Sequence, residues 1–346
     1  MLIVMDAHAS QEDIDAVCTV IAEMGFHANP MPGPTRTAIG ITGNEGAITE
    51  ASRIKLLPGV RDVIRVTSPY KLVSREYREL DTVLDINGVL IGGQEIVVMA
   101  GPCSVESREQ LFTTADAVRA AGATILRGGA FKPRTSPYSF QGMGEEGLQL
   151  LAEARERTGM PVITEVMDTE TVDLVADYAD ILQLGARNMQ NYALLKKVGR
   201  SRRPVMLKRG LSSTVKDWLL SAEYIMAEGN PAVILCERGI RTFDNHSRFT
   251  FDLSAVPILR ELTHLPIIVD PSHATGRWQS VLPMARAGIA SGADGLMIEV
   301  HPNPAFAVSD GEQSLLPERF AELMAQIERV AAAVDRPVAG RSPVAL

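Results

Sequence analysis

One short segment of the sequence concentrates side chains that bind anions. Residues 126–136 read LRGGAFKPRTS and follow a short apolar run. Arginine offers paired donors that match phosphate and carboxylate oxygens, lysine adds a mobile point charge, and glycines let the backbone approach a ligand closely. A solvated basic loop is the alternative interpretation. Because similar cations recur along the chain, we favour an anion-binding loop formed by Arg127, Lys132, Arg134, Thr135 and Ser136.

Further cations follow other apolar runs. Arg187, Lys208 and Arg238 each come shortly after a run that is typical of a buried strand. If these cations and the three of the anion-binding loop meet in one pocket, their mutual repulsion requires anions nearby. Pairing with Glu165 and Glu237 accounts for only part of the charge of six cations. The pattern therefore predicts a ligand with phosphate and carboxylate groups.

A mixed set of possible metal ligands follows the first and the last two apolar runs, at Cys103, His273, Glu299 and Asp310. One sulfur, one nitrogen and two oxygen donors suit a divalent transition ion and leave a position open for a substrate oxygen. His301 is an alternative member of this set. A nucleophilic Cys/His pair is a competing interpretation, but six cations serve no purpose in peptide or acyl transfer.

Eight repeats of strand and helix explain how these residues meet. The predicted strands are 96–100, 124–126, 162–166, 181–184, 204–207, 232–235, 266–269 and 295–300, and the helices between them include 108–121, 144–157, 169–178 and 214–228. Eight units within about 250 residues are typical of an α/β (β/α)8 TIM barrel, whose active site lies at the C-terminal ends of the strands. An open, doubly wound sheet is the alternative, but eight regular repeats favour closure.

Two smaller regions precede the predicted barrel at residues 94–346. Residues 1–67 follow the order β-α-β-β-α-β of a small ferredoxin-like α+β domain, with a turn expected at residues 30–34 and a second helix at 45–57. The region shows no catalytic residues, which favours a regulatory role. Residues 68–93 are expected to be a connector ending in a β-hairpin, because Asn87-Gly88 lies between apolar residues.

The composition excludes several classes of partner. The formal net charge is −8, so neither nucleic acid nor an anionic membrane surface is an expected partner. No apolar run approaches the length of about 20 residues that crosses a membrane. Three widely spaced cysteines do not suggest a disulfide framework. We therefore expect a cytoplasmic protein.

Motifs at the predicted strand ends carry a family resemblance. They read MAGPCSVE (99–106), LRGGAFKPRTS (126–136), GARN (185–188), LKRG (207–210), ILCERG (234–239), VDPSH (269–273) and IEVH (298–301). Together they resemble the 3-deoxy-D-arabino-heptulosonate 7-phosphate (DAHP) synthases, and the added first domain resembles their type I beta branch. The resemblance implies condensation of phosphoenolpyruvate with D-erythrose 4-phosphate and water, which yields DAHP and phosphate at the first step of the shikimate pathway.

The resemblance also implies a role for each matching residue. It assigns a divalent metal ion, such as Mn, Fe, Co or Zn, to Cys103, His273, Glu299 and Asp310. It assigns the phosphate of phosphoenolpyruvate to Arg187, Arg238 and the Ala186 backbone, and the carboxylate to Arg127 and Lys208. It assigns erythrose 4-phosphate to Arg134, Thr135 and Ser136. Lys132 would lie between the substrates, and Lys132 and His273 are the expected catalytic residues.

Other enzyme classes remain as alternatives. A 3-deoxy-D-manno-octulosonate 8-phosphate synthase uses arabinose 5-phosphate on a similar barrel, but the sequence at 133–135 favours the four-carbon aldose. A Schiff-base aldolase would use Lys132 or Lys208 with a lowered pKa. A catalytically inactive sensor is disfavoured, because all candidate ligands and cations are present.

Two further expectations come from the family alone. These enzymes suggest a homotetramer, and a separate chorismate mutase is a possible partner because the chain contains no helical mutase domain. In regulated relatives the first domain binds an aromatic amino acid. Here residues 29–34 are short of polar donors, which disfavours inhibition by tyrosine or phenylalanine. The tail from residue 332 is expected to be poorly ordered.

Overall fold

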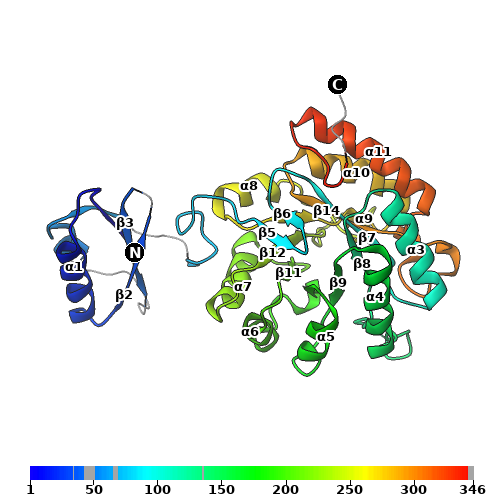
Figure 1. Cartoon of the computed structure of the whole chain (residues 1–346), viewed down its shortest axis with the longest axis horizontal. Helices are drawn as coiled ribbons and strands as arrows, with labels where there is room; N and C mark the ends of the chain where they lie inside the picture. Colours follow the sequence, from blue (N-terminus) through cyan, green and yellow to red (C-terminus); the bar gives the residue numbers. More distant parts are fainter. Residues whose placement is uncertain (34, 43–50, 65–68, 135, 342–346) are drawn as a thin grey trace. The chain divides into compact units, whose positions relative to one another are not determined.

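The chain forms two compact units, Met1–Pro69 and Tyr70–Leu346, each with its own hydrophobic core. The computed structural model describes residues 1–33, 35–42, 51–64, 69–134 and 136–341 (Figure 1). Parts of the predicted helix at 45–57, of the predicted turn at 30–34 and of the tail lie outside the described residues. No described helix is both long and apolar enough to cross a membrane.

The first unit has the predicted ferredoxin-like order of elements. They are β1 (Leu2–Met5), α1 (Gln11–Glu23), β2 (His27–Pro32), β3 (Thr37–Thr42), α2 (Ala51–Lys55) and β4 (Val60–Ile64). The strands form a sheet in the order β2-β3-β1-β4. Helix α1 begins with a capping box, in which Ser10 and Asp13 exchange hydrogen bonds.

The turn predicted at residues 30–34 begins later than expected. Strand β2 continues through Pro30 to Pro32 and pairs with β3 along its whole length. Proline lacks the N–H that a central strand needs for both neighbours, but β2 is at the edge of the sheet. The extended backbone of an edge strand therefore accommodates residues that we expected in a turn.

The second unit is a closed parallel barrel of eight strands, which confirms the TIM barrel and rejects the open sheet. Its strands are β7 (Val97–Gly101), β8 (Ile125–Arg127), β9 (Val162–Glu165), β10 (Ile181–Leu184), β11 (Val205–Lys208), β12 (Val233–Glu237), β13 (Ile267–Val269) and β14 (Gly295–Glu299). Each strand pairs with the next in sequence, and β14 pairs with β7 to close the barrel.

Helices cover the outside of the barrel (Figure 1). They are α3 (Arg108–Ala120), α4 (Glu145–Thr158), α5 (Val172–Tyr178), α6 (Tyr192–Arg200), α7 (Val215–Ala227), α8 (Ala255–Leu262), α10 (Trp278–Ala290) and α11 (Pro317–Ala333). The short, mostly buried helix α9 (Pro271–Thr275) follows the C-terminal end of β13. Helix α5 begins three residues later than predicted. Asp168 accepts the backbone N–H groups of Glu170 and Thr171, so that segment forms a side-chain-stabilised turn before the helix.

Alternation along the strands places polar residues above an apolar barrel interior. One inner cluster includes Ile125, Ile163, Ile181, Met206, Cys236, Ile268 and Met297. Successive side chains of a strand point to opposite faces, so the residue two positions later also points inward. Those residues are Arg127, Glu165, Gln183, Lys208, Arg238, Asp270 and Glu299. The strands therefore present one layer of charge at their C-terminal ends.

A short hairpin packs with the same inner cluster. Strands β5 (Leu84–Ile86) and β6 (Val89–Ile91) pair in antiparallel fashion, which confirms the hairpin predicted at Asn87-Gly88. Both turn residues have positive φ, as this tight turn requires. Ile86 and Ile91 join the interior cluster of the barrel. The hairpin thus contributes apolar side chains to the interior beneath the charged layer.

Candidate active site

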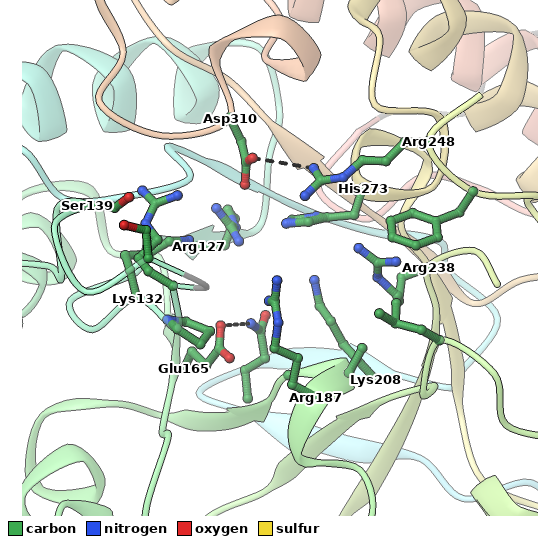
Figure 2. A pocket seen from close by; sticks show the side chains of 18 residues that line it. Arg127, Lys132, Ser139, Glu165, Arg187, Lys208, Arg238, Arg248, His273 and Asp310 are labelled. Atoms are coloured by element: carbon green, nitrogen blue, oxygen red, sulfur yellow. Dashed lines mark hydrogen bonds and ion pairs between the residues drawn. The ribbon is translucent and has the colours of Figure 1, made fainter. Parts of the chain in front are cut away.

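A cavity of about 360 Å³ opens at the C-terminal ends of the strands. Its lining includes all six predicted cations, at Arg127, Lys132, Arg134, Arg187, Lys208 and Arg238. Figure 2 shows the side chains of Arg187 and Lys208 pointing into the space from the side opposite Asp310, while Arg238 and Arg248 enter it from a third side. The structure therefore brings together cations from four different strand ends and the loops after them.

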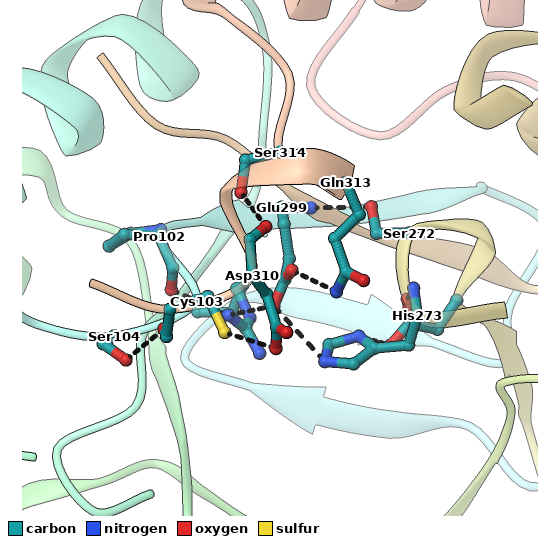
Figure 3. A network of polar contacts seen from close by, with 12 residues as sticks. Pro102, Cys103, Ser104, Ser272, His273, Glu299, Asp310, Gln313 and Ser314 are labelled. Atoms are coloured by element: carbon teal, nitrogen blue, oxygen red, sulfur yellow. Dashed lines mark hydrogen bonds and ion pairs between the residues drawn. The ribbon is translucent and has the colours of Figure 1, made fainter. Parts of the chain in front are cut away.

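The four predicted metal ligands also converge at this cavity (Figure 3). One donor atom from each of Cys103, His273, Glu299 and Asp310 lies within 4.8 Å of all the others. The Cys103 thiol donates to Oδ2 of Asp310 across 3.2 Å, and Nε2 of His273 lies 3.3 Å from Oε1 of Glu299. This spacing of sulfur, nitrogen and oxygen donors fits a divalent transition ion.

Asp270 fixes the orientation of His273. It is fully buried and caps α9, where its Oδ1 accepts the His273 N–H across 2.9 Å. Its Oδ2 lies 2.7 Å from Nδ1 of His273, which leaves Nε2 facing the other three ligands. Burial alone would raise the pKa of Asp270, but the charges of His273 and Lys208 outweigh it and hold that pKa well below its usual range.

Cys103 and Lys132 form a close pair. The ammonium of Lys132 lies 3.0 Å from the Cys103 sulfur and 3.0 Å from its carbonyl oxygen. Burial, followed by the charge of Glu299, raises the pKa of Cys103 to about 12. A cysteine nucleophile needs a thiolate near neutral pH, so the competing nucleophilic interpretation loses support.

The Schiff-base alternative also loses support at Lys132. Burial favours a lower pKa for this lysine, but the acidic groups around it, Cys103, Glu165 and Glu299, outweigh burial and raise that pKa. A lysine that forms a Schiff base needs a lowered pKa. Lys132 is therefore a protonated hydrogen-bond donor in this cavity.

Some of the strand-end cations have carboxylate partners. Arg127 contacts Glu299 at 3.1 Å, and Lys208 contacts Asp270 at 2.6 Å. Arg209, which follows Lys208, turns away from the cavity to Glu237 and Asp252. Glu237 therefore pairs with Arg209 and not with a cation of the cavity. Glu165 accepts a hydrogen bond from Gln183.

Other cations have no carboxylate partner among the described residues. Arg238 is buried, and its Nη1 makes no hydrogen bond within the described residues. Arg127 does contact Glu299, but its buried Nε has no partner there either. Arg187 is exposed in the cavity. Arg134 donates only to backbone carbonyls, at Phe140 and Val308. Buried donors without partners are rare in native proteins, so Nη1 of Arg238 and Nε of Arg127 are available to donate to the oxygens of a ligand.

The remaining predicted residues lie close to the same space. Ser136 and Ala186 line the cavity, and Ala186 begins a 3-10 turn, η1 (Ala186–Asn188), directly after β10. Gly185 precedes it, and a side chain there would collide with the Glu165 carboxylate. Thr135 lies outside the described residues.

His301 is not a member of the ligand group. Its Nε2 lies 3.2 Å from Glu106, and its Nδ1 accepts the N–H of Asn303. Glu106 also accepts the N–H of Val308. His301 therefore helps to hold the loop that carries Asp310, whose φ of 49° is in the left-handed region that aspartate tolerates.

Arg248 and Phe249 are cavity residues that the sequence analysis missed. Arg248 contacts Asp310 at 3.3 Å and Gln313 at 2.7 Å, and Phe249 lines the cavity beside it. Both lie in the middle of the long segment between β12 and α8, so their distance from any predicted strand end hid them. A basic and an aromatic residue in a segment that follows a barrel strand are the only signal that the sequence offers.

The geometry agrees with comparisons to known proteins. Residues 76–334 match the DAHP synthetase I family, and residues 1–68 match the DAHP synthase ferredoxin-like domain. A phospho-2-dehydro-3-deoxyheptonate aldolase of Thermotoga maritima is 49% identical over 96% of this chain and 98% of the relative. A 2-dehydro-3-deoxyphosphooctonate aldolase of Acidithiobacillus ferrooxidans is 31% identical over 67% of this chain and 88% of the relative.

Solved structures extend this similarity to three dimensions. The crystal structure of DAHP synthase from Thermotoga maritima superposes with a TM-score of 0.78, is 49% identical, and covers 97% of this chain and 98% of its own. A truncated form of the Thermotoga maritima synthase gives a TM-score of 0.73 over 77% of this chain and 98% of its own. As its motifs predicted, the chain belongs to the DAHP synthetase I family.

Proposed function

We propose that the cavity described above is where this enzyme joins phosphoenolpyruvate to D-erythrose 4-phosphate. The reaction of the family consumes water and yields DAHP and inorganic phosphate, at the first step of the shikimate pathway. The observation that carries the site assignment is the set of unpaired cations beside four convergent metal-ligating side chains. Two phosphates and one carboxylate are anions that such a set can bind.

Phosphoenolpyruvate occupies the inner part of the cavity in this proposal. Arg187 and Arg238, together with the Ala186 backbone, bind its phosphate, because neither guanidinium has a carboxylate partner among the described residues. Arg127 and Lys208 bind its carboxylate. Both already contact a protein carboxylate at the base of the cavity, which fixes their side chains before the substrate arrives.

Erythrose 4-phosphate binds towards the cavity mouth. Arg134 and Ser136 lie in the loop after β8, and Thr135 between them completes the proposed phosphate site. The guanidinium of Arg134 donates its hydrogen bonds to backbone carbonyls. These groups are uncharged, so they do not neutralise the positive charge of Arg134. The aldehyde then points inward, towards Lys132 and the four candidate ligands.

The chain's own residues orient the substrates and move a proton. C3 of phosphoenolpyruvate forms a bond to the aldehyde carbon, and the new alkoxide takes a proton from Lys132. Water adds to the cationic C2 and loses a proton. As the C2–O bond to phosphate breaks, the C2 hydroxyl gives its proton to the leaving phosphate, C2 becomes the ketone, and the bridging oxygen leaves with the phosphate. Arg187 and Arg238 stabilise the leaving phosphate.

A divalent metal ion is the cofactor that the donor set fits. Cys103, His273, Glu299 and Asp310 would hold it, with His273 oriented by Asp270. When bound, the ion would act as a Lewis acid towards the aldehyde oxygen. Manganese, iron, cobalt and zinc all accept such a mixed set.

Phosphate release tests the substrate assignment. We expect phosphate release from phosphoenolpyruvate when erythrose 4-phosphate is present, and little release when arabinose 5-phosphate replaces it. Treatment with EDTA should abolish phosphate release with either sugar. Equal rates with the two sugars, or none with erythrose 4-phosphate in the presence of each candidate metal, would reject it. Borohydride reduction in the presence of substrate should trap no covalent adduct.

An isotopic label tests the bond that breaks. Phosphoenolpyruvate labelled with ¹⁸O at the bridging position should transfer the label to inorganic phosphate. Retention of the label in the sugar product would mean P–O cleavage and would reject the scheme above.

The cellular setting and assembly complete the proposal. We place the enzyme in the cytoplasm, because its three cysteines are free thiols. A homotetramer is the assembly expected from the family, and a separate chorismate mutase is its proposed partner. Sedimentation of the purified chain, alone and mixed with such a mutase, tests both.

A further inference from the structure

The least accessible phosphate-binding cation rests on an aromatic ring. The guanidinium carbon of Arg238 lies 4.2 Å from the ring centroid of Phe249, within the range of a cation–π contact. Arg238 is only 6% exposed, and its Nη1 is buried without a hydrogen-bond partner. Its side chain therefore depends on this ring for a favourable contact inside the cavity.

The ring is held in place by its backbone. The N–H of Phe249 donates to the carbonyl of Ala274 across 3.0 Å, and its carbonyl accepts from the Ser247 hydroxyl across 2.8 Å. Gly239 packs closely against Phe249, because a Cβ added at Gly239 would lie only 2.7 Å from the Cβ of Phe249. Ala274 belongs to α9, the helix that carries His273. Phe249 therefore contacts both Arg238 and α9, the helix that carries the candidate metal ligand His273.

The other buried cations of the charged layer are held differently. Arg127 and Lys208 contact the carboxylates of Glu299 and Asp270. A carboxylate at Arg238 would fix the guanidinium too, but it would compete with the substrate phosphate for the same donors. An aromatic ring fixes the plane of the guanidinium and occupies none of its N–H groups. The ring also lies 5.7 Å from the guanidinium carbon of Arg248, a second cation at this wall of the cavity.

We propose that Phe249 is a positioning residue for phosphoenolpyruvate, because it stacks on Arg238 and aims the free N–H groups of that arginine at the substrate phosphate. The proposal rests on the assignment of Arg238 to that phosphate. Phe249, in the segment between β12 and α8, would then be one of the residues that determine the affinity for phosphoenolpyruvate. Its effect should be confined to phosphoenolpyruvate, since the cations that Phe249 contacts in the described part of the chain are Arg238 and Arg248, and neither is proposed to bind erythrose 4-phosphate.

The test compares two substitutions at one position. Phe249→Leu keeps an apolar side chain but removes the aromatic face, whereas Phe249→Tyr keeps the face. We expect Phe249→Leu to raise the KM for phosphoenolpyruvate about fivefold or more, which is within the strength of a desolvated cation–π contact. The KM for erythrose 4-phosphate and the affinity for Mn²⁺ should stay within about twofold, and Phe249→Tyr should restore the wild-type KM.

Phe251→Leu is the matched control. Phe251 lies in the same segment but packs against the main core, outside the cavity lining. If Phe249→Leu has the same KM for phosphoenolpyruvate as Phe251→Leu, the proposal is wrong. It is equally wrong if Phe249→Tyr is as impaired as Phe249→Leu, or if both substrates are affected alike, because those results indicate a merely structural role.

A binding measurement separates this proposal from the proposed function. Calorimetric titration of the wild-type protein with phosphoenolpyruvate, without sugar, should show binding that Phe249→Leu weakens by the same factor as its KM. Binding without turnover of erythrose 4-phosphate would reject the proposed reaction but keep the role of Phe249. Equal affinity of wild type and Phe249→Leu would reject the role of Phe249 alone.

Discussion

At the scale of single residues, Asp270 connects two parts of the site that bind different partners. One of its oxygens contacts Nδ1 of His273 at 2.7 Å and Nζ of Lys208 at 2.6 Å. The histidine belongs to the candidate metal group, and the lysine is proposed to bind the substrate carboxylate. A single buried anion therefore orients both, and its loss should affect both.

Asp270→Asn tests this connection. The amide keeps the size of the side chain but removes the charge that pairs with Lys208 and orients His273. We expect the affinity for Mn²⁺ to fall about 10- to 100-fold, the usual cost of losing such an outer partner, and the KM for phosphoenolpyruvate to rise. Competition with a chromophoric chelator measures the first effect without any turnover.

Asp252→Asn is the control for Asp270→Asn. Asp252 contacts Arg209 at 2.7 Å and touches neither Lys208 nor the candidate ligands. Metal affinity should stay at the wild-type value in this variant. Equal losses in the two variants would show that any missing carboxylate at this end of the barrel has the same consequence.

The site residues differ in how well the sequence predicted them. Arg127, Lys208 and Glu299 end short apolar runs, so alternation along a strand was enough to turn them inward. Arg248 and Phe249 were missed because contacts with Asp310 and Arg238 place them, and no local pattern encodes such contacts. For Thr135 the prediction remains untested.

At the scale of elements, a histidine secures the connector to the barrel. His264 precedes β13 and is 2% exposed. Its Nε2 lies 2.8 Å from the Leu72 carbonyl, and its Nδ1 lies 2.7 Å from the Thr82 hydroxyl. The backbone carbonyl of His264 also accepts the N–H of Thr82. The neutral ring with a proton on Nε2 satisfies both side-chain contacts.

The stability of the barrel should therefore fall in mild acid. Burial, with Arg78 and Arg75 acting in the same direction, lowers the pKa of His264 although Leu72 and Asp81 oppose the shift. Below the unfolded-state pKa of about 6.5, the unfolded chain binds a proton that the folded chain resists. The contribution of His264 to the free energy of unfolding is therefore at its full value above about pH 6.5, and it decreases as the pH falls below that value.

Unfolding by urea between pH 5 and 8 measures this effect. His264→Gln should flatten the decline in stability below about pH 6.5, the unperturbed pKa of histidine. His246→Gln, at a side chain that is 94% exposed, should leave the decline as it is in the wild type. A decline of the same size in His264→Gln would show that other groups cause it.

The elements were predicted more reliably than their ends. All eight barrel strands were expected, because short buried runs followed by polar residues recur at regular intervals. The differences have local causes, such as the turn that Asp168 stabilises before α5 and the prolines that the edge strand β2 accommodates. Both depend on hydrogen-bond partners that single-residue preferences do not specify.

At the scale of the whole molecule, each of the two units has a hydrophobic core of its own. The core of the first unit includes Ile39, and the cores of the second include Ile181. No core cluster of the described residues contains side chains from both units. Each unit should therefore unfold in its own cooperative transition.

Truncation of one core side chain in each unit tests this independence by calorimetry. Ile39→Ala should destabilise the first unit by about 2–5 kcal/mol, the usual cost of such a buried change, and lower only one of two transitions. Ile181→Ala should lower only the other. A single transition that both variants shift by the same amount would mean that the units unfold together.

The pairing of β14 with β7 has a consequence for synthesis on the ribosome. These strands pair from Gly295 opposite Val97 to Glu299 opposite Gly101, so the seam joins the start of the barrel to a strand made almost 200 residues later. Cys103 follows one strand of this seam, and Glu299 ends the other. A nascent chain therefore exposes an open sheet edge until β14 emerges. The candidate metal group is complete only after β14 and then Asp310 have emerged. Metal loading is therefore expected to be one of the last steps in the maturation of each newly made chain.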